Sequence, residues 1–113
     1  MQYFCIMTVV KKNKYNARKT EYNGVTYDSK KEAMRAQQLD NMLANGDIIN
    51  IERQVPIRCV INGKLICKLV CDFVYTLADN SVVHEDVKGM VLPVFKLKQK
   101  LVKAMHGIDI IIF

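Results

Sequence analysis

The sequence predicts an α/β (α+β) fold in which a mixed central sheet is flanked by helices. Two stretches, at residues 29–45 and 93–106, repeat apolar residues at helical spacing and end before a glycine. Three β-type runs joined by tight turns lie between them, and a short apolar strand follows the second helix. The expected element order is therefore αβββαβ, in one domain over residues 1–113 that is large enough for a hydrophobic core.

The N-terminal run MQYFCIMTVV is apolar but short, and no basic residue precedes it. It is too short to span a bilayer and lacks the charged start of a signal peptide. We therefore expect a cytoplasmic protein with no membrane partner. Within residues 1–13 this run is expected to form an extra strand or an arm, and it could supply part of a dimer interface.

Residues 11–20 (KKNKYNARKT) are basic and contain no acid. One interpretation is a solvated, flexible arm. The other is a phosphate-contacting arm in which Lys14, Arg18 and Lys19 supply charge and Tyr15 stacks on bases. The formal net charge of +6, from 17 Lys and Arg against 11 Asp and Glu, favours a polyanionic partner, nucleic acid before membrane.

The first helix follows a small hairpin that Asn23-Gly24 predicts. It opens at Ser29-Lys30-Lys31-Glu32 and runs to about Asn45. Its apolar or small positions at helical spacing are Ala33, Ala36, Leu39, Met42 and Leu43. Glu32 either completes a Ser-x-x-Glu capping box or points from the first turn into a metal site, and the local sequence favours the cap.

Three strands are expected in the middle of the chain. Residues 51–61 and 64–76 are joined by a turn at Asn62-Gly63, and residues 82–88 follow the second turn. Pro56 indicates that the first of these strands lies at an edge or carries a bulge.

The second turn, Asp79-Asn80-Ser81, decides which side chains meet across the last two strands. A loop with an odd number of residues, centred on Asn80, places Asp72 opposite Lys88 and diagonal to Asp86. An even loop turns Asp72 to the other face. Asp86 and Lys88 are two residues apart on one strand, so they share a face.

The second helix is expected from about Pro93, whose missing amide costs nothing at a helix start, to His106, with Gly107 as its cap. The expected buried stripe is Val94, Leu97, Leu101 and Met105. The basic positions Lys96, Lys98, Lys100 and Lys103 fall largely on the other faces. Such a run is usually a solvated face, but beside an acidic site it could follow a phosphate backbone.

The four cysteines, at positions 5, 59, 67 and 71, are best explained as reduced thiols of a cytoplasmic protein. The spacing from Cys67 to Cys71 puts two sulfurs on one strand face. A zinc knuckle has a tighter arrangement.

Hydrolytic chemistry is suggested by the acids at 72 and 86, which Glu32 could join. Carboxylates are hard oxygen ligands suited to Mg²⁺, with Mn²⁺ as a substitute. Such an ion polarises a phosphodiester and lowers the pKa of a bound water. Lys88 could orient or help deprotonate that water, or stabilise the charge growing on the phosphate.

Each of these residues also has a structural interpretation. Asp72 could protect an edge strand, and Asp86 with Lys88 could form a weak surface ion pair. Glu85 should face the opposite side of the strand. His84 shares the face of Asp86 and is more plausible as a structural histidine, and Gln54 could support the acids from the earlier strand.

The set Glu32, Asp72 and Asp86-x-Lys88 resembles the PD-(D/E)XK nuclease superfamily. The runs KYNARKTEYNGVTYDSKKEA, CDFVYTL and EDVKGMVLPVFKLKQKL resemble more closely a phage-encoded family of unknown function, usually placed in that superfamily near Holliday-junction resolvases and transposon end-cleaving endonucleases. The resemblance covers roughly residues 14–113. It departs from the motif before the first acid, where Cys71 replaces the proline.

The resemblance implies a restriction-endonuclease-like core. In such a core Asp72, Asp86 and Glu32 would bind Mg²⁺ and Lys88 would be the catalytic lysine, and Glu32 then becomes a site residue that can still cap its helix. From charge and position, DNA contacts are expected from the basic arm and the second helix, at Lys14, Tyr15, Arg18, Lys19, Lys96, Lys98 and Lys100.

The favoured hypothesis is a phage-type, Mg²⁺-dependent DNA endonuclease, with a Holliday junction or other branched DNA as substrate and no small-molecule cofactor. Resolvases cut two strands as symmetric dimers, so a homodimer is expected, in the host cytoplasm if the protein is phage-encoded. The alternative is a DNA-binding module that keeps the fold without catalysis. A third interpretation is a phage protein that binds a host protein.

Overall fold

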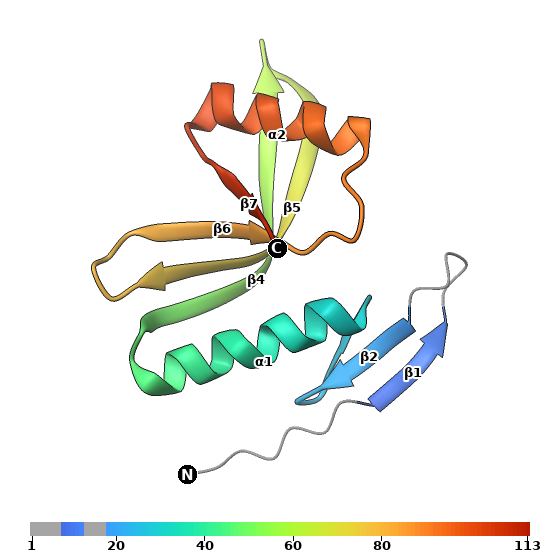
Figure 1. Cartoon of the computed structure of the whole chain (residues 1–113). Coiled ribbons are helices and arrows are strands. Elements are labelled where there is room, and N and C mark those ends of the chain that lie inside the picture. The colour runs from blue at the N-terminus through green and yellow to red at the C-terminus, as the bar shows by residue number, and fades with distance from the viewer. Residues whose placement is uncertain (1–7, 13–17) are drawn as a thin grey trace. The chain divides into compact units, whose positions relative to one another are not determined.

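The computed structural model describes residues 8–12 and 18–113, and the side chains of residues 19–113. The chain divides into two compact units, Met1–Asn45 and Gly46–Phe113. The mixed α+β composition that the sequence predicts is confirmed, and from the first long helix onward the element order is αβββαβ (Figure 1). That the two units act together as one nuclease-like domain stays a prediction.

The first unit contains an antiparallel sheet of three short strands in the order β1-β2-β3. These are β1 (Thr8–Lys12), β2 (Arg18–Tyr22) and β3 (Val25–Tyr27). The predicted hairpin at Asn23-Gly24 is confirmed: the two residues have φ angles of 53° and 78°, as a type I′ turn requires. Residues 1–7 of the expected N-terminal arm lie outside the described residues, whereas β1 forms a strand.

Helix α1 (Lys30–Asn45) follows and packs on β2 and β3. The Oγ of Ser29 accepts the backbone N–H of Glu32 at 3.1 Å, so the predicted N-terminal cap is present. The buried residues of α1 are Glu32, Ala33, Ala36 and Leu39, whereas the predicted apolar position Leu43 is 40% exposed. No helix in the described ranges has the length and apolar character needed to cross a membrane.

The second unit holds a four-stranded mixed sheet in the order β4-β5-β6-β7. Its strands are β4 (Ile48–Ile61), β5 (Lys64–Leu77), β6 (Val82–Asp86) and β7 (Ile110–Ile112). Strands β4, β5 and β6 form an antiparallel meander, whereas β7 runs parallel to β6 after the crossover through α2. Pro56 lies on an edge strand, as predicted.

The loop between β5 and β6 has an odd number of residues, as one of the predicted alternatives required, but its central residue differs from the predicted one. Leu77 and Ser81 face each other, with the N–H of Leu77 donating to the carbonyl of Ser81 at 2.8 Å. The pairs run from Thr76–Val82 to Phe73–Glu85, so the loop is centred on Asp79 and not on Asn80. Asn80 adopts a left-handed φ of 72°, which closes a turn of this length without glycine.

Helix α2 (Pro93–His106) has the predicted bounds and lies across one face of the sheet (Figure 1). The expected buried stripe is wrong at Val94 and Leu97, which are 65% and 60% exposed, whereas Leu101 packs against the core as predicted. Val102, which was not predicted, is 0% exposed. The inward face includes a polar residue, Gln99, whose Nε2 donates to the carbonyl of Ile110 at 3.1 Å. Because this inward-facing residue is polar, counting apolar residues at helical spacing identified the wrong buried face.

The core of this unit lies between α2 and the sheet. The helix contributes Val102, with Phe95 and Leu101 half-buried beside it. The buried strand residues of the core are Ile57, Cys59, Leu69, Cys71, Val74 and Ile110. Close packing here fixes the middle of β5 and the end of β6, which carry the candidate site.

Candidate active site

Asp72 and Asp86 meet on adjacent strands. Extending the β5–β6 register by one residue from the Phe73–Glu85 pair puts Asp72 directly opposite Asp86. The prediction had Lys88 opposite Asp72. Because the loop centre moved by one residue, the pairing moved by two, and the acids stay on one face. The correction therefore brings the two carboxylates closer together than the sequence predicted.

Asp72 is held in place through both carboxylate oxygens. Its Oδ1 accepts the Nε2 of Gln54 at 3.2 Å, and its Oδ2 accepts the backbone N–H of Val87 at 2.9 Å. The second bond spans the β5–β6 pair just beyond the last residue of β6. Asp72 is thus oriented by one side chain and one amide from its two neighbouring strands.

Asp86 ends β6 with only 1% of its surface exposed. Its Oδ2 lies 3.4 Å from the Nζ of Lys88, whereas its Oδ1 has no hydrogen-bond partner among the described residues. Burial, and secondarily the neighbouring Asp72 carboxylate, raise the pKa of Asp86 to about 7. A buried carboxylate oxygen without a donor, beside a second carboxylate, is a site at which a cation would be stabilising.

Lys88 faces the acids from beyond the end of β6. Its ammonium group lies 4.8 Å from the ring centroid of Phe95, at a distance that permits a cation–π contact, and its side chain is about one-third exposed. The backbone is anchored by Phe113, whose carbonyl accepts the N–H of Lys88 at 3.3 Å and whose N–H donates to the carbonyl of Asp86 at 2.9 Å. The sequence contained no spacing signal that would have identified Phe95 as the partner of the lysine.

Gln54 lies opposite Asp72 within β4, with a φ of 53° in the middle of a strand. A positive φ is unfavourable for a residue with a side chain, by roughly 1–3 kcal/mol, and is often retained at functional sites. The prediction that Gln54 could support the acids agrees with its hydrogen bond to Asp72.

Cys71 precedes the first acid, where the nuclease motif has proline. It is fully buried, and burial, with the charges of Asp86 and Asp72 as smaller causes, raises its pKa to about 12. The thiol is therefore neutral at physiological pH and supplies no thiolate for nucleophilic attack or metal binding. Cys59, Cys67 and Cys71 are all free thiols.

Two further titratable residues, Glu85 and His84, lie on β6. Glu85 faces away from the acids, as predicted, and is buried, with the hydroxyl of Tyr75 donating to its Oε1 at 3.0 Å. His84 is half-buried, and burial lowers its pKa below the usual value. A neutral imidazole agrees with the structural role that the sequence favoured.

Glu32 belongs to the first unit, whereas Asp72, Asp86 and Lys88 belong to the second. Its side chain is buried. Among the described residues no cluster of three or more His, Cys, Asp and Glu side chains is arranged to hold a metal ion. The contribution of Glu32 to a three-carboxylate site stays a prediction.

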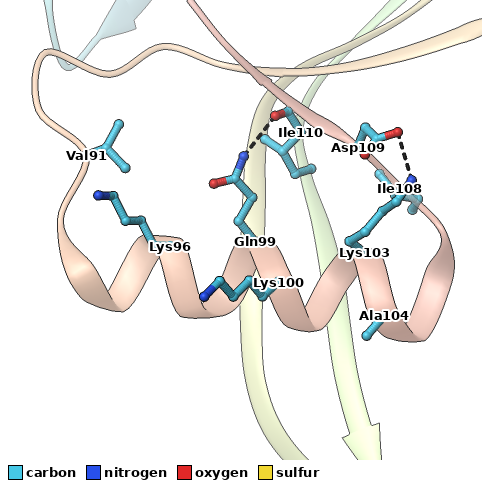
Figure 2. Close-up of a pocket in the computed structure, with 9 residues that line it drawn as sticks. All are labelled: Val91, Lys96, Gln99, Lys100, Lys103, Ala104, Ile108, Asp109 and Ile110. Atoms are coloured by element: carbon cyan, nitrogen blue, oxygen red, sulfur yellow. Dashed lines mark hydrogen bonds and ion pairs between the residues drawn. The ribbon is translucent and has the colours of Figure 1, made fainter.

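The residues predicted to contact DNA fall into different places. Lys14 and Tyr15 lie outside the described residues. Arg18 begins β2 but its side chain is outside the description, and Lys19 is half-buried on the same strand. On α2, Lys96 and Lys100 are exposed beside a groove (Figure 2).

Lys98 is separated from the other predicted α2 contacts. Its Nζ donates to the carbonyl of Lys68 at 3.2 Å, and it does not line the groove. Lys103, which was not predicted to bind DNA, does line it. Helical spacing alone would have found this: Lys96, Lys100 and Lys103 recur at the i, i+4, i+7 positions of one face.

Comparison with protein families gives one match. Residues 12–108 match the family model described as "Protein of unknown function (DUF1064)". The chain belongs to this family. No curated protein and no solved structure matches the chain.

In this DUF1064 chain the second unit presents a donor set that fits a hard divalent cation. Asp72 and Asp86 are carboxylates on one face, and the Oδ1 of Asp86 is buried with no donor in the described part of the chain. Lys88 neutralises part of their charge from one side. These residues could hold Mg²⁺ or Mn²⁺, and the DUF1064 description itself names no activity.

Proposed function

We propose that this chain is a divalent-metal-dependent DNA endonuclease that hydrolyses phosphodiester bonds in branched DNA, such as a Holliday junction. The observation that carries the proposal is the buried Asp86, whose Oδ1 has no donor among residues 8–12 and 18–113, while Asp72 lies opposite and Lys88 lies beside it. A purely structural acid in such a place would be expected to have its hydrogen bonds satisfied.

In this proposal Asp72 and Asp86 hold Mg²⁺, for which Mn²⁺ can substitute, and Glu32 completes the ligand set. When bound, the ion polarises the phosphodiester and lowers the pKa of a water molecule. Asp72 is pre-oriented by its bonds to Gln54 and Val87, so its ligand oxygens need little rearrangement.

Lys88 supplies the positive charge of the site in this mechanism. Its Nζ is held between Asp86 and the ring of Phe95, which keeps the ammonium close to the acids. From there it can orient the attacking water or stabilise the negative charge that grows on the phosphate. Loss of this charge should abolish cutting while the metal ligands stay in place.

The net charge of +6 supports DNA as the partner. A branched substrate requires two cuts, and a symmetric homodimer would present two such sites. The proposal includes that homodimer, action in the cytoplasm of the host if the protein is phage-encoded, and no small-molecule cofactor.

The test is cleavage of labelled four-way-junction, fork, duplex and single-stranded DNA, with Mg²⁺ or with EDTA. Asp86→Asn and Lys88→Ala should abolish metal-dependent cutting. Matched controls are Asp47→Asn, at an exposed acid of the same unit, and Lys64→Ala, at the exposed β4–β5 turn, which should cut like wild type. Circular dichroism establishes that each variant is folded.

The outcomes separate the rival functions. Cutting that needs the metal and is lost only in the site variants supports the nuclease. Wild-type protein that binds DNA equally with and without EDTA and cuts none of the substrates overturns it in favour of a non-catalytic DNA-binding module. Absence of binding to any DNA at low salt also overturns it and leaves binding of a host protein.

A further inference from the structure

A groove of about 570 Å³ runs along α2 beside the segment that leads into β7 (Figure 2). Three lysines of the helix line it: Lys96, Lys100 and Lys103. The remaining lining is largely apolar and comes from Val91, Ala104, Ile108 and Ile110, with Gln99 and Asp109 as the polar exceptions. The groove therefore combines a row of cations with an apolar wall.

We propose that this groove binds the backbone of the DNA strand that flanks the cut site. This deepens the proposed function and rests on it. The lysines recur over two helical turns, with a rise of about 6 Å from Lys96 to Lys100. Such a row matches successive phosphates of one strand, and the apolar wall matches the deoxyribose faces between them.

One end of the groove lies close to the candidate site along the chain. Val91, at one end of it, belongs to the loop that leads from Lys88 to α2. The ammonium of Lys88 contacts Phe95, the residue before Lys96. A strand whose scissile phosphate lies at the acids would therefore reach Lys96 first and Lys103 last.

The far end of the groove is closed by an ion pair. The Nζ of Lys103 lies 2.9 Å from the Oδ2 of Asp109, and both side chains are exposed (Figure 2). An exposed pair of this kind contributes little to stability, so a phosphate can compete for Lys103. Asp109 repels an incoming phosphate, so it limits how far the strand extends along the groove.

Gln99 and Lys98 show that the groove is a defined structure and not only a charged surface of the helix. Its Nε2 donates to the carbonyl of Ile110, which fixes the wall between helix and strand (Figure 2). Lys98 carries the same charge on the same helix but is directed to the carbonyl of Lys68, outside the groove. It is therefore not one of the lysines that line the groove.

The test measures fluorescence anisotropy of a labelled junction and a single strand in EDTA, so that binding is read without cutting. The double variant Lys96→Ala/Lys100→Ala should bind at least about tenfold more weakly, and its slope of log affinity against log salt should fall by about 1.4–1.8. The control Lys64→Ala/Lys68→Ala removes the same charge from two exposed positions of β5 outside the groove and should keep both values near wild type. Asp109→Asn should bind more tightly.

The results distinguish the groove from the nuclease itself. If wild type cuts DNA and the groove variant binds and cuts like the control, the groove proposal is overturned while the nuclease stands. An equal loss in both double variants also overturns it, because net charge would then explain the effect. If wild type binds no DNA, both proposals fall. Competition by a short oligonucleotide, but not by a mononucleotide, identifies the strand as ligand, and equal competition overturns that assignment.

Discussion

Gln54, at a φ of 53°, donates a hydrogen bond from its Nε2 to the Oδ1 of Asp72 across the β4–β5 pair at 3.2 Å. The strand keeps its register on both sides of this residue, from the Arg53–Phe73 pair to the Val55–Cys71 pair. The positive φ at Gln54 is therefore not accompanied by an extra residue in the β4–β5 pairing. Gln54 instead directs its side-chain amide toward Asp72, the acid that we propose as a metal ligand.

Gln54→Gly separates the backbone strain from the amide contact. Glycine adopts a positive φ without steric cost, so thermal stability should stay level or rise slightly. Loss of the amide should weaken Mg²⁺ binding by roughly tenfold or more, as for other partners that orient a ligand. Calorimetric titration with Mg²⁺ measures this, and unchanged affinity would show that Gln54 does not orient Asp72.

The raised pKa of Asp86 predicts a pH dependence of stability in the absence of metal. Between the ordinary carboxyl value and about 7 the folded protein binds more protons at Asp86 than the unfolded chain does. The free energy of unfolding should therefore fall as pH rises through this interval, by up to about 1.4 kcal/mol per pH unit.

Urea unfolding of wild type and Asp86→Asn in EDTA, at pH 5 and pH 8, isolates this effect. The lowered pKa of His84 acts in the opposite direction, and it cancels in the comparison because both proteins contain it. Wild type should lose stability relative to Asp86→Asn as pH rises. Parallel pH profiles for the two proteins would contradict the assignment.

Mg²⁺ should stabilise the folded chain through the acids. At pH 8, where Asp86 is ionised, a cation relieves the repulsion between Asp72 and Asp86 and should raise the melting temperature. Asp86→Asn should lose this response, while the exposed Asp47→Asn should keep it. Equal shifts in all three proteins would indicate non-specific binding of the ion.

The orientation of α2 is tested by two truncations. Val102→Ala removes methyl groups from a position with no exposure and should cost about 1–3 kcal/mol of unfolding free energy. Leu97→Ala, at 60% exposure, should cost less than about 0.5 kcal/mol. Chemical denaturation of both variants measures the two losses of unfolding free energy. A larger loss for Leu97→Ala than for Val102→Ala would support the buried face that apolar spacing predicted.

Local chemistry made much of the fold predictable from sequence. The Asn-Gly pairs at 23–24 and 62–63 have the positive φ angles that two-residue hairpins need. Helix α2 begins at Pro93, and the left-handed Gly107 caps it. In each case one or two residues determine the geometry without help from the rest of the chain.

Features that depend on distant contacts were predicted less well. The β5–β6 turn has several residues able to bend the chain, and the choice of Asp79 as centre depends on how the two strands pair. Which face of α2 points inward depends on the hydrogen bond from Gln99 to the carbonyl of Ile110 on β7, a contact between residues of different elements. The two strand acids and Lys88 lie together, as predicted. Glu32 belongs to the other unit, and the spacing of residues in a sequence does not predict how two units are arranged.

The parallel pairing of β6 with β7 has a consequence for the order of folding. Asp72 and Asp86 are brought together by a hairpin, whose local contacts form quickly, whereas β7 can dock only after the whole α2 crossover is in place. The like-charged acids would therefore approach each other before Phe113 anchors the backbone of Asp86 and Lys88. We expect closure of β7 to be the late step that completes the site.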